Sequence, residues 1–415
     1  MSIDSLIPIR EEARELAERF VARGHRIYLV GGVVRDAIAG LPLGSAFDLD
    51  LTTDAQPGVV KSILEGWADT LWTQGERFGT VGARRGDRRV EITTHRTERY
   101  RPGSRKPDVI FADAIRVDLS RRDFTINSMA VELPSGGLVD PFDGAGDLVA
   151  RRLRTPLDPA ETFSDDPLRM LRAARFLAQL DLTAAPSLMV AMATMADRLD
   201  IVAHERIRDE LDRLLALPNP GPGFGLLLET GLGERVLGPV GDRAAALSRL
   251  SRVGDDPMAR LAALMAGGGS LDQVRAALVE RRATNSTRRR VLAVLAAARG
   301  ALDRPPRTLA ELRRWVIGAG SHLDQAVAVA STLGDVGTLA TDVAALREAE
   351  PDLGGPPVLD GGEIMTLLGL DPGPEVGAAV EELRRHRLDS GPLTLEEAHA
   401  HLLSWQLQKT SKPNT

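Results

Sequence analysis

Residues 27–53 read IYLVGGVVRDAIAGLPLGSAFDLDLTT, and this segment is the most informative about the fold. It opens with the apolar run IYLV, which is typical of a buried strand and ends at Gly31 and Gly32. Residues 33–39 then favour a helix, which Gly40 ends. The stretch therefore predicts a strand, a tight glycine turn and a helix start in immediate succession.

The glycine turn has two features that suit an anionic ligand. Gly31 and Gly32 have no Cβ, so backbone N–H groups at the start of the helix can approach a phosphate closely. Arg35 lies one turn further along, where its guanidinium group can bind the same anion. A glycine pair after a strand is more often only a turn, so this interpretation depends on what lies nearby.

A pair of carboxylates follows at a spacing of two. Asp48 and Asp50 flank Leu49 at the start of a second strand. Because residues two apart on a strand project from the same face, both side chains are expected to meet at one point. Such oxygen ligands beside a phosphate site suit Mg²⁺, which keeps substrate phosphates among its ligands. Taken alone, an Asp-x-Asp pair is more often a solvated strand edge.

Together, GGVVRD and DLDLTT resemble the head domain of the tRNA nucleotidyltransferase and bacterial poly(A) polymerase family. The resemblance implies an α+β fold, with a polymerase-β-like nucleotidyltransferase head of mixed or mostly antiparallel sheet and an all-α remainder. We expect a catalytic head at 1–150, a neck at 151–216, a body at 217–350 and an RNA-binding tail at 351–415. The implied reaction adds C and A from CTP and ATP to the 3′ end of tRNA, with two Mg²⁺ ions held by Asp48 and Asp50.

Glu91 is a third candidate carboxylate. It alternates with Val90 and Ile92 on the second of two strands predicted within residues 80–94. On spacing alone, a solvated position and a place beside the aspartates are equally good interpretations. Family members carry an acidic residue on this strand, so the resemblance favours a catalytic role.

The segment at residues 97–111, TERYRPGSRKPDVIF, is polar, basic and turn-rich, and it predicts a mobile loop. It resembles the flexible loop that family members use when they change from adding C to adding A. Relatives that add only CC are shortened here, so its presence speaks against a CC-only enzyme.

A second block that resembles the family reads DLSRRDFTINSMAV, at residues 118–131. Within it, Arg122 and Asp123 resemble the family's contacts with the ribose and the phosphates. A carboxylate can accept a hydrogen bond from a 2′-hydroxyl group, which distinguishes RNA precursors from deoxy ones. Standing alone, the block would be interpreted as an ion pair at the N-terminus of a helix.

A third block, TFSDDPLRMLRAARFLAQL at residues 162–180, predicts a helix that starts at Pro167 with Asp166 as its N-cap. Arg169, Arg172 and Arg175 recur every three residues, and a solvated face explains such a basic stripe about as often as a ligand site does. The block resembles the family's base-reading motif E-D-x-x-R, with an aspartate at position 165 where glutamate is usual.

The resemblance makes Asp166 and Arg169 the pair that reads the base. Cytosine and adenine present an amino donor beside a ring-nitrogen acceptor, which match a carboxylate and a guanidinium group, whereas uracil and guanine present the opposite pattern. Arg172 and Arg175 would supply charge to the phosphates or brace Asp166. The next helical segment, HERIRDELDRLL at residues 204–215, is assigned to packing of the neck.

Composition excludes several other classes of protein. None of the 415 residues is cysteine, which excludes disulfides, thiolate metal sites and cysteine nucleophiles. No apolar run approaches the ~18 residues of a membrane span, and we expect a cytoplasmic protein. None of the seven histidines precedes an aspartate, so a His-Asp phosphohydrolase domain is not expected.

The net charge of −6 speaks weakly against a general nucleic-acid binder. Arginine clusters such as residues 288–290 can hold tRNA phosphates, although a solvated helix face explains any single cluster better. Three other functions stay open. A poly(A) polymerase, or an enzyme that adds only A or only CC, shares these motifs. A transferase that adenylylates a small molecule has no need of the arginine-rich helix. A catalytically silent RNA-binding protein is disfavoured by the intact Asp48 and Asp50.

Overall fold

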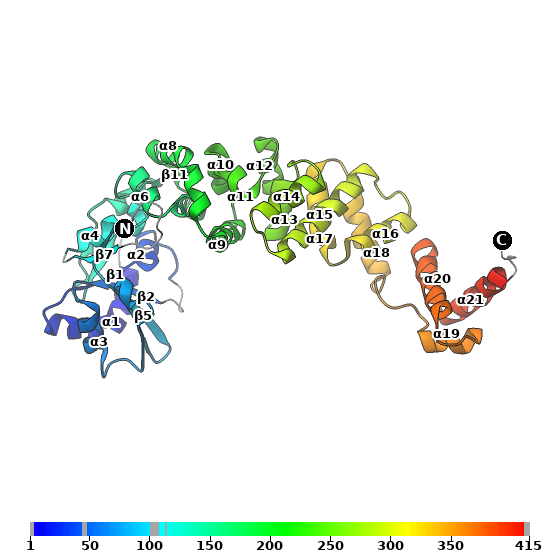
Figure 1. The fold of residues 1–415 in the computed structure, drawn as a ribbon, viewed down its shortest axis with the longest axis horizontal. Coiled ribbons are helices and arrows are strands. Elements are labelled where there is room, and N and C mark those ends of the chain that lie inside the picture. Colours follow the sequence, from blue (N-terminus) through cyan, green and yellow to red (C-terminus); the bar gives the residue numbers. More distant parts are fainter. Residues whose placement is uncertain (1–3, 44–47, 100–107, 113, 411–415) are drawn as a thin grey trace. The chain divides into compact units, whose positions relative to one another are not determined.

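The computed structural model describes residues 4–43, 48–99, 108–112 and 114–410 (Figure 1). The chain divides into two compact units, Met1–Val236 and Leu237–Thr415. Within the described ranges, every helix is too short or too polar to cross a membrane.

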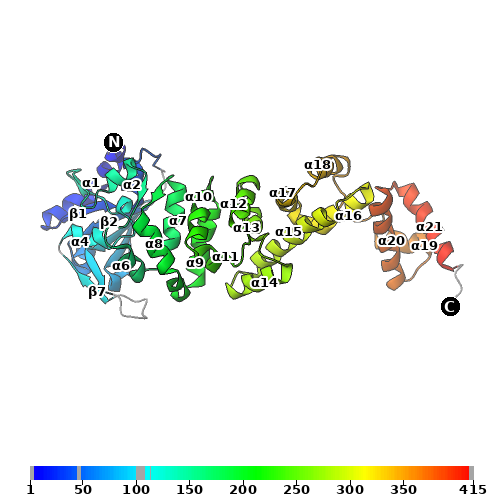
Figure 2. The same ribbon diagram turned by 90° about the horizontal axis from the view of Figure 1, so that it is seen from above.

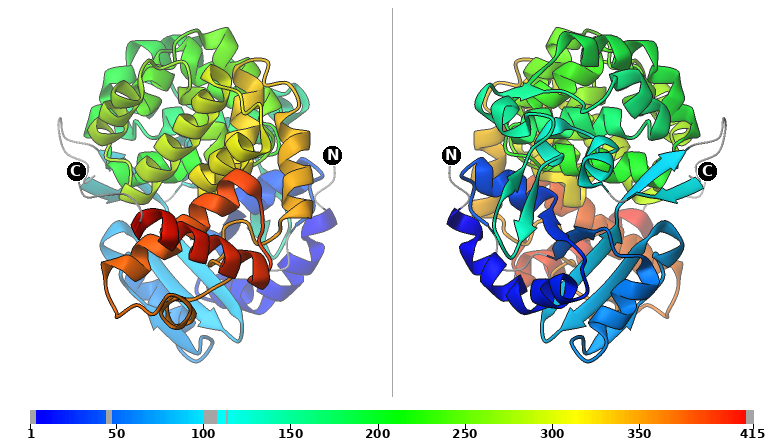
Figure 3. Two further views of the ribbon diagram at one scale, coloured as in Figure 1. Left: turned by 90° about the vertical axis from the view of Figure 1, so that its right-hand side faces the viewer. Right: turned by 90° about the vertical axis from the view of Figure 1, so that its left-hand side faces the viewer.

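The first unit is built on a mixed sheet, whose strands run in colour from blue to blue-green in Figures 1 and 3. In the described part of the chain its order is β3-β4-β5-β2-β1-β8-β9, and all neighbours are antiparallel except β2 and β5. This confirms the predicted mixed sheet. The strands are β1 Ile27–Val30, β2 Leu49–Thr53, β3 Thr70–Trp72, β4 Thr80–Arg85, β5 Arg88–Thr94, β8 Ala130–Leu133 and β9 Leu138–Val139.

The opening stretch forms the centre of this sheet. β1 pairs with β2 on one side and with β8 on the other, and all four of its residues are buried. Ile27 and Leu29 belong to the main core, and Tyr28 and Val30 belong to a smaller apolar cluster. Gly31 follows with φ +84°, a left-handed conformation that favours glycine, and helix α2 runs over Gly32–Ile38. The predicted strand, glycine turn and helix are therefore confirmed.

Two helices pack their apolar residues into the core of the sheet. Helix α1, Ile7–Ala22, buries apolar residues at helical spacing, including Leu16 and Phe20. Helix α3, Pro57–Leu64, adds Val60 and Ile63 to the same core. This packing holds β2, the internal strand that carries Asp50, in a fixed position.

The prediction of a mobile loop at residues 97–111 is wrong at both of its ends. Strand β6, Arg96–Arg99, pairs antiparallel with β7, Asp108–Phe111, from Arg96 opposite Phe111 to Arg99 opposite Asp108. The run VIF within β7 has high strand propensity, and pairing satisfies its backbone groups. Residues 100–107 lie outside the described residues.

The rest of the first unit is almost entirely helical. Its remaining elements include a short parallel pair of strands, β10 Arg152–Leu153 and β11 Thr183–Ala184. The helices are α4 Ile115–Ser120, α5 Gly144–Val149, α6 Pro159–Asp165, α7 Arg169–Gln179, α8 Pro186–Thr194, α9 His204–Leu215, α10 Gly221–Glu229 and α11 Leu232–Leu237.

The second unit consists of helices with two hydrophobic clusters in its described residues. One cluster lies within residues 253–353, and the other, within residues 359–402, is formed where α19, α20 and α21 lie side by side (Figure 2). The helices are α12 Arg243–Arg252, α13 Pro257–Met265, α14 Leu271–Glu280, α15 Asn285–Asp303, α16 Leu309–Ala319, α17 Leu323–Leu333, α18 Leu339–Ala349, α19 Gly361–Leu368, α20 Pro374–Ser390 and α21 Leu395–Thr410. This confirms the helical remainder, whereas the four predicted domain ranges stay a prediction.

Candidate active site

A cavity of about 450 Å³ lies in the first unit, between the glycine turn, the segment around Asp123 and helix α7. It brings together residues that are far apart in the sequence. Among the predicted site residues, Asp48, Glu91 and Arg175 are outside its lining. The other predicted residues line it: Gly31, Gly32, Arg35, Asp50, Arg122, Asp123, Asp166, Arg169 and Arg172.

Asp50 lies directly against the glycine turn. A Cβ on Gly31 would come within 3.1 Å of Asp50 Oδ2, so glycine permits this close approach as well as the positive φ. In the parallel pairing of β2 and β5, Asp50 lies opposite Glu91. Partial desolvation raises the pKa of Asp50, and the charges of Glu91 and Asp48 raise it further, against the opposing effect of Arg122.

Asp48 and Glu91 lie beside the cavity, and both are close to the guanidinium group of Arg89. Arg89 Nε is 3.9 Å from Asp48 Oδ2, and Arg89 Nη2 is 3.5 Å from Glu91 Oε1. Within the described ranges, no three histidine or acidic side chains are grouped to hold a metal ion by themselves. The joint role of Asp48, Asp50 and Glu91 therefore stays a prediction.

Arg35 is buried, and protein groups hold its guanidinium. Its Nη1 donates to Asn127 Oδ1 at 2.9 Å and its Nε donates to Asp36 Oδ1 at 2.8 Å. Its guanidinium carbon also lies 5.1 Å from the centre of the Phe176 ring. Arg35 thus supports the lining next to Gly32, where its Nη2 is 3.3 Å from the position of an added Cβ.

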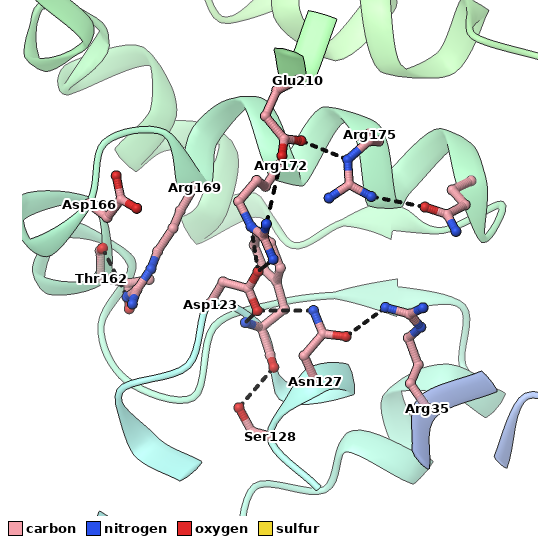
Figure 4. Close-up of polar contacts among 12 residues, drawn as sticks. Arg35, Asp123, Asn127, Ser128, Thr162, Asp166, Arg169, Arg172, Arg175 and Glu210 are labelled. Carbon is pink, nitrogen blue, oxygen red and sulfur yellow. Dashed lines mark hydrogen bonds and ion pairs between the residues drawn. The ribbon is translucent and has the colours of Figure 1, made fainter. Parts of the chain in front are cut away.

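Asp123 is a buried carboxylate with four donors around it (Figure 4). Oδ1 accepts from the N–H of Phe124 and from Asn127 Nδ2, both at 2.9 Å. Oδ2 accepts from Arg172 Nε at 2.8 Å and Nη2 at 2.7 Å. Burial alone would raise the pKa of Asp123, but Arg172 and Asn127 outweigh it and hold that pKa below its usual range.

Arg122 lies between two carboxylates. Its Nη2 is 3.5 Å from Asp118 Oδ2, and its charge acts on Asp50 across the cavity. Its Nε is buried without a hydrogen-bond partner among the described residues. Arg122 therefore lines the cavity as a positive charge that acts on Asp50.

Asp166 and Arg169 lie next to each other, but the predicted helix start is wrong by two residues. Helix α6 ends at Asp165, Asp166 is extended with φ −142°, and α7 begins only at Arg169. A turn at Pro167 and Leu168 separates the two helices, and Asp166 Oδ1 caps it by accepting from the N–H of Leu168 at 3.2 Å.

Two backbone carbonyl groups hold Arg169. Its Nη2 donates to the carbonyl of Arg121 at 2.6 Å and its Nη1 donates to that of Thr162 at 3.3 Å. Figure 4 draws the contact with Thr162, and both Arg169 and Asp166 line the cavity.

Arg172 and Arg175 bind carboxylates other than Asp166. Arg172 lies between Asp123 and Glu210, whose Oε1 is 3.7 Å from Arg172 Nη1. Arg175 Nε donates to Glu210 Oε2 at 2.7 Å, and Arg175 is buried outside the cavity lining. These two arginines therefore join α7 to α9 (Figure 4).

Four residues of the cavity lining are absent from the sequence prediction: Arg121, Asn127, Phe176 and Arg206. Phe176 lies on α7 seven residues after Arg169, which is two helical turns, so helical spacing could have identified it. Arg206 lies in the helix that was assigned to neck packing. Helix α9 does bury Glu210, Leu214 and Leu215 as predicted, but its first turn also reaches the cavity.

The comparison with protein families agrees with this geometry. Residues 27–154 match the model described as the poly A polymerase head domain. Residues 27–154 are a poly A polymerase head domain. Residues 181–243 match the model of a probable RNA- and SrmB-binding site of polymerase A. The family resemblance expected from the motifs is therefore confirmed.

Several individual proteins resemble the chain beyond the head domain. The CCA-adding enzyme of Limosilactobacillus fermentum is 40% identical over 233 residues, which is 56% of this chain and 56% of the relative. The chain thus matches little more than half the length of that relative. The CCA-adding enzyme of Bacillus stearothermophilus, solved in complex with CTP, has a TM-score of 0.69 at 25% identity, covering 96% of this chain and 98% of that one.

The fold extends to more distant structures. The Thermotoga maritima CCA-adding enzyme, solved in complex with tRNA, has a TM-score of 0.73 at 19% identity, with 96% of each chain covered. This likeness covers the helical remainder as well as the head domain.

Proposed function

We propose that this chain is a template-independent nucleotidyltransferase that adds C and A from CTP and ATP to the 3′ end of tRNA. The observation that carries the proposal is that Asp50, the Gly31–Gly32 turn, Asp166 and Arg169 line one cavity. The cavity thus holds Asp50, a carboxylate suited to phosphate chemistry. It also holds Asp166 and Arg169, whose side chains suit the hydrogen-bonding edge of a base. The relatives named CCA-adding enzyme support the same reaction.

Base selection is assigned to Asp166 and Arg169. The carboxylate accepts from the exocyclic amino group, and the guanidinium donates to the ring nitrogen, a pattern that cytosine and adenine share. Uracil or guanine would place an acceptor against the carboxylate and a donor against the guanidinium. Each unpaired group costs about 1–3 kcal/mol, so the protein itself serves as the template.

We assign two Mg²⁺ ions to Asp48 and Asp50, with Glu91 as the third carboxylate. Carboxylate oxygens are the ligands that Mg²⁺ prefers. A divalent cation would offset both the desolvation and the carboxylate repulsion that raise the pKa of Asp50. When bound, such ions activate the attacking 3′-hydroxyl group and neutralise charge on the departing pyrophosphate.

The remaining residues bind and orient the nucleotide. Gly31 and Gly32 bring backbone N–H groups to the triphosphate, and Arg35 adds positive charge behind them. Arg122 and Asp123 are assigned to the sugar and phosphates. Arg172 keeps Asp123 ionised and in place, and Arg175 secures Arg172 through their shared partner Glu210.

The proposal is tested with tRNAs that end before the tail, in C, or in CC. Purified protein and Mg²⁺ are incubated with each tRNA and with CTP, ATP or both, and the products are weighed by mass spectrometry. We expect CTP to extend the tRNA that lacks the tail and the tRNA that ends in C, in both cases only as far as CC. ATP should then add a single A to a tRNA that ends in CC. A ladder of many A residues would identify a poly(A) polymerase instead, and no extension would overturn the proposal.

The metal assignment is tested by replacing Asp48 and Asp50 together with alanine. We expect activity to fall about a thousandfold or more, because charge stabilisation worth several kcal/mol is lost, while tRNA binding is retained. Asp181→Ala is the matched control, since this aspartate is exposed and outside the cavity lining. Full activity of the double variant would contradict the assignment.

A further inference from the structure

The side chain of Arg206 binds the carboxylate of Asp166, which is assigned to recognition of the base. Its Nη2 is 2.7 Å from Asp166 Oδ2, and its Nη1 is 3.4 Å from Asp166 Oδ1. The two residues are forty positions apart, and both line the cavity. The planar guanidinium thus meets both oxygen atoms of Asp166 with a two-pronged contact.

This contact limits how Asp166 can accept hydrogen bonds. An ionised carboxylate offers about four acceptor positions, two on each oxygen. Oδ1 already accepts from the N–H of Leu168 at 3.2 Å and from Arg206, whereas Oδ2, among the described residues, accepts from Arg206 alone. About one acceptor position therefore remains, and it lies on Oδ2.

The backbone that carries Arg206 is itself well anchored. Arg206 lies in the first turn of α9, and the same helix is tied to α7 by the buried ion pair of Glu210 with Arg175. The side chain of Arg206 is 51% exposed, so it covers the open side of Asp166 without entering the core. Asp166 is thus held from its own turn and from a second helix.

We propose that Arg206 is a positioning residue that sets base selectivity by fixing the Asp166 carboxylate, a role that rests on the proposed nucleotide transfer. With Arg206 in place, the free position on Oδ2 receives one hydrogen of the exocyclic amino group. Without it, the carboxylate keeps only the Leu168 contact and can rotate. It can then accept the ring N–H of uracil or guanine, which is the feature that the site has to reject.

The test compares kcat/KM for CTP, ATP, UTP and GTP in the full-length protein and in Arg206→Ala. We expect the preference for CTP over UTP to fall about tenfold or more, with a smaller loss of kcat/KM for CTP itself. Arg206→Lys should not restore the preference, because one ammonium group keeps the charge but cannot hold both oxygens. A purely structural role would lower all four rates together.

Arg235→Ala is the matched control. Arg235 also pairs with an aspartate, Asp200, at 2.7 Å in the first unit, but neither residue lines the cavity. Its removal should leave the selectivity ratio unchanged. Because the Arg206 side chain is half-exposed, its loss should leave the melting temperature nearly unchanged, which thermal unfolding of the variant checks.

Two results overturn the inference. One is an unchanged preference for CTP over UTP in Arg206→Ala. The other is tighter CTP binding in that variant, which would make Arg206 an obstacle that the nucleotide displaces. Failure of the proposed function is distinct, because the unaltered protein would then extend no tRNA with any nucleotide.

Discussion

At the scale of single residues, Asp50 shows how a side chain placed for catalysis lowers the stability of the folded state. Its surroundings raise its pKa above the ordinary value, so the folded state favours the protonated form. A carboxyl group with a raised pKa stabilises the fold fully only below the unfolded-state pKa of about 3.9, and this contribution is lost as pH rises through the folded-state pKa. At neutral pH, the ionised Asp50 is therefore destabilising.

Asp50→Asn is expected to raise the melting temperature at pH 7 while abolishing nucleotide addition. The amide carries no charge, so the repulsion from Glu91 and Asp48 and the desolvation penalty are removed. The gain should become small near pH 3.5, where most of the wild-type carboxyl groups are protonated in both states. Thermal unfolding at the two pH values measures this difference.

Asp181→Asn provides the control, because Asp181 is exposed and pairs only with the exposed Arg151 among the contacts of the described residues. It should change the melting temperature little at either pH. Added Mg²⁺ should raise the melting temperature of the wild type, since a cation bound to the folded state stabilises it, but not that of Asp50→Asn. Equal Mg²⁺ shifts in both proteins would contradict the metal assignment.

At the scale of elements, the junction of α7 and α9 depends on Glu210. This side chain is only 4% exposed, and it lies 2.7 Å from Arg175 and 3.7 Å from Arg172. Glu210→Ala would leave the buried Arg175 without its carboxylate partner, which typically costs about 3–5 kcal/mol. We expect a loss of that size in the free energy of unfolding, measured by urea denaturation.

Arg213→Ala is the matched control for this junction. Arg213 also contacts Glu210, at 3.4 Å, but its side chain is 64% exposed. Its removal should cost less than about 1 kcal/mol. If Glu210→Ala lost as little stability as Arg213→Ala is expected to lose, the buried ion pair would be unimportant. Helix α9 would then be held by its apolar residues.

The same elements show which features sequence patterns can predict. The strand at β1, the glycine turn and α9 were predicted because hydrophobic periodicity and glycine chemistry are local properties. The sequence prediction misses the pairing of β6 with β7 because the polar, turn-rich composition of residues 97–108 outweighs the short apolar run at 109–111, and the pairing depends on hydrogen bonds between the two segments. The start of α7 was placed too early because the break at Asp166 depends on the end of α6.

The candidate site divides in the same way. Gly31, Asp50, Asp166 and Arg169 stand in short motifs, so their residue types and spacing indicated them directly. The partners of these residues follow from how distant elements pack. Arg172 meets Asp123 across forty-nine positions, and Arg206 meets Asp166 across forty. No local pattern encodes such pairs, and Arg206 was therefore assigned to packing.

At the scale of the whole molecule, the division into two units separates two tasks. All residues that line the candidate active site lie within Met1–Val236. Arginine clusters such as residues 288–290, at the start of α15, belong to the second unit. Contacts with phosphates supply much of the affinity of a protein for nucleic acid, and they make that affinity dependent on salt. The second unit is therefore expected to contribute to tRNA affinity but not to base selection.

A fragment of residues 1–238, which ends just after α11, tests this division. The first unit has its own sheet core, so we expect the fragment to unfold cooperatively and to bind CTP about as tightly as the full chain does. Its affinity for tRNA should fall tenfold or more, with a weaker dependence on salt concentration, because phosphate contacts of the second unit are lost. Calorimetry with CTP and a tRNA titration at several salt concentrations measure the two affinities.

The full chain with alanine at 288–290 is the companion variant, which should lose part of the tRNA affinity and none of the CTP affinity. A fragment that binds tRNA as tightly as the full chain would assign tRNA binding to the first unit alone.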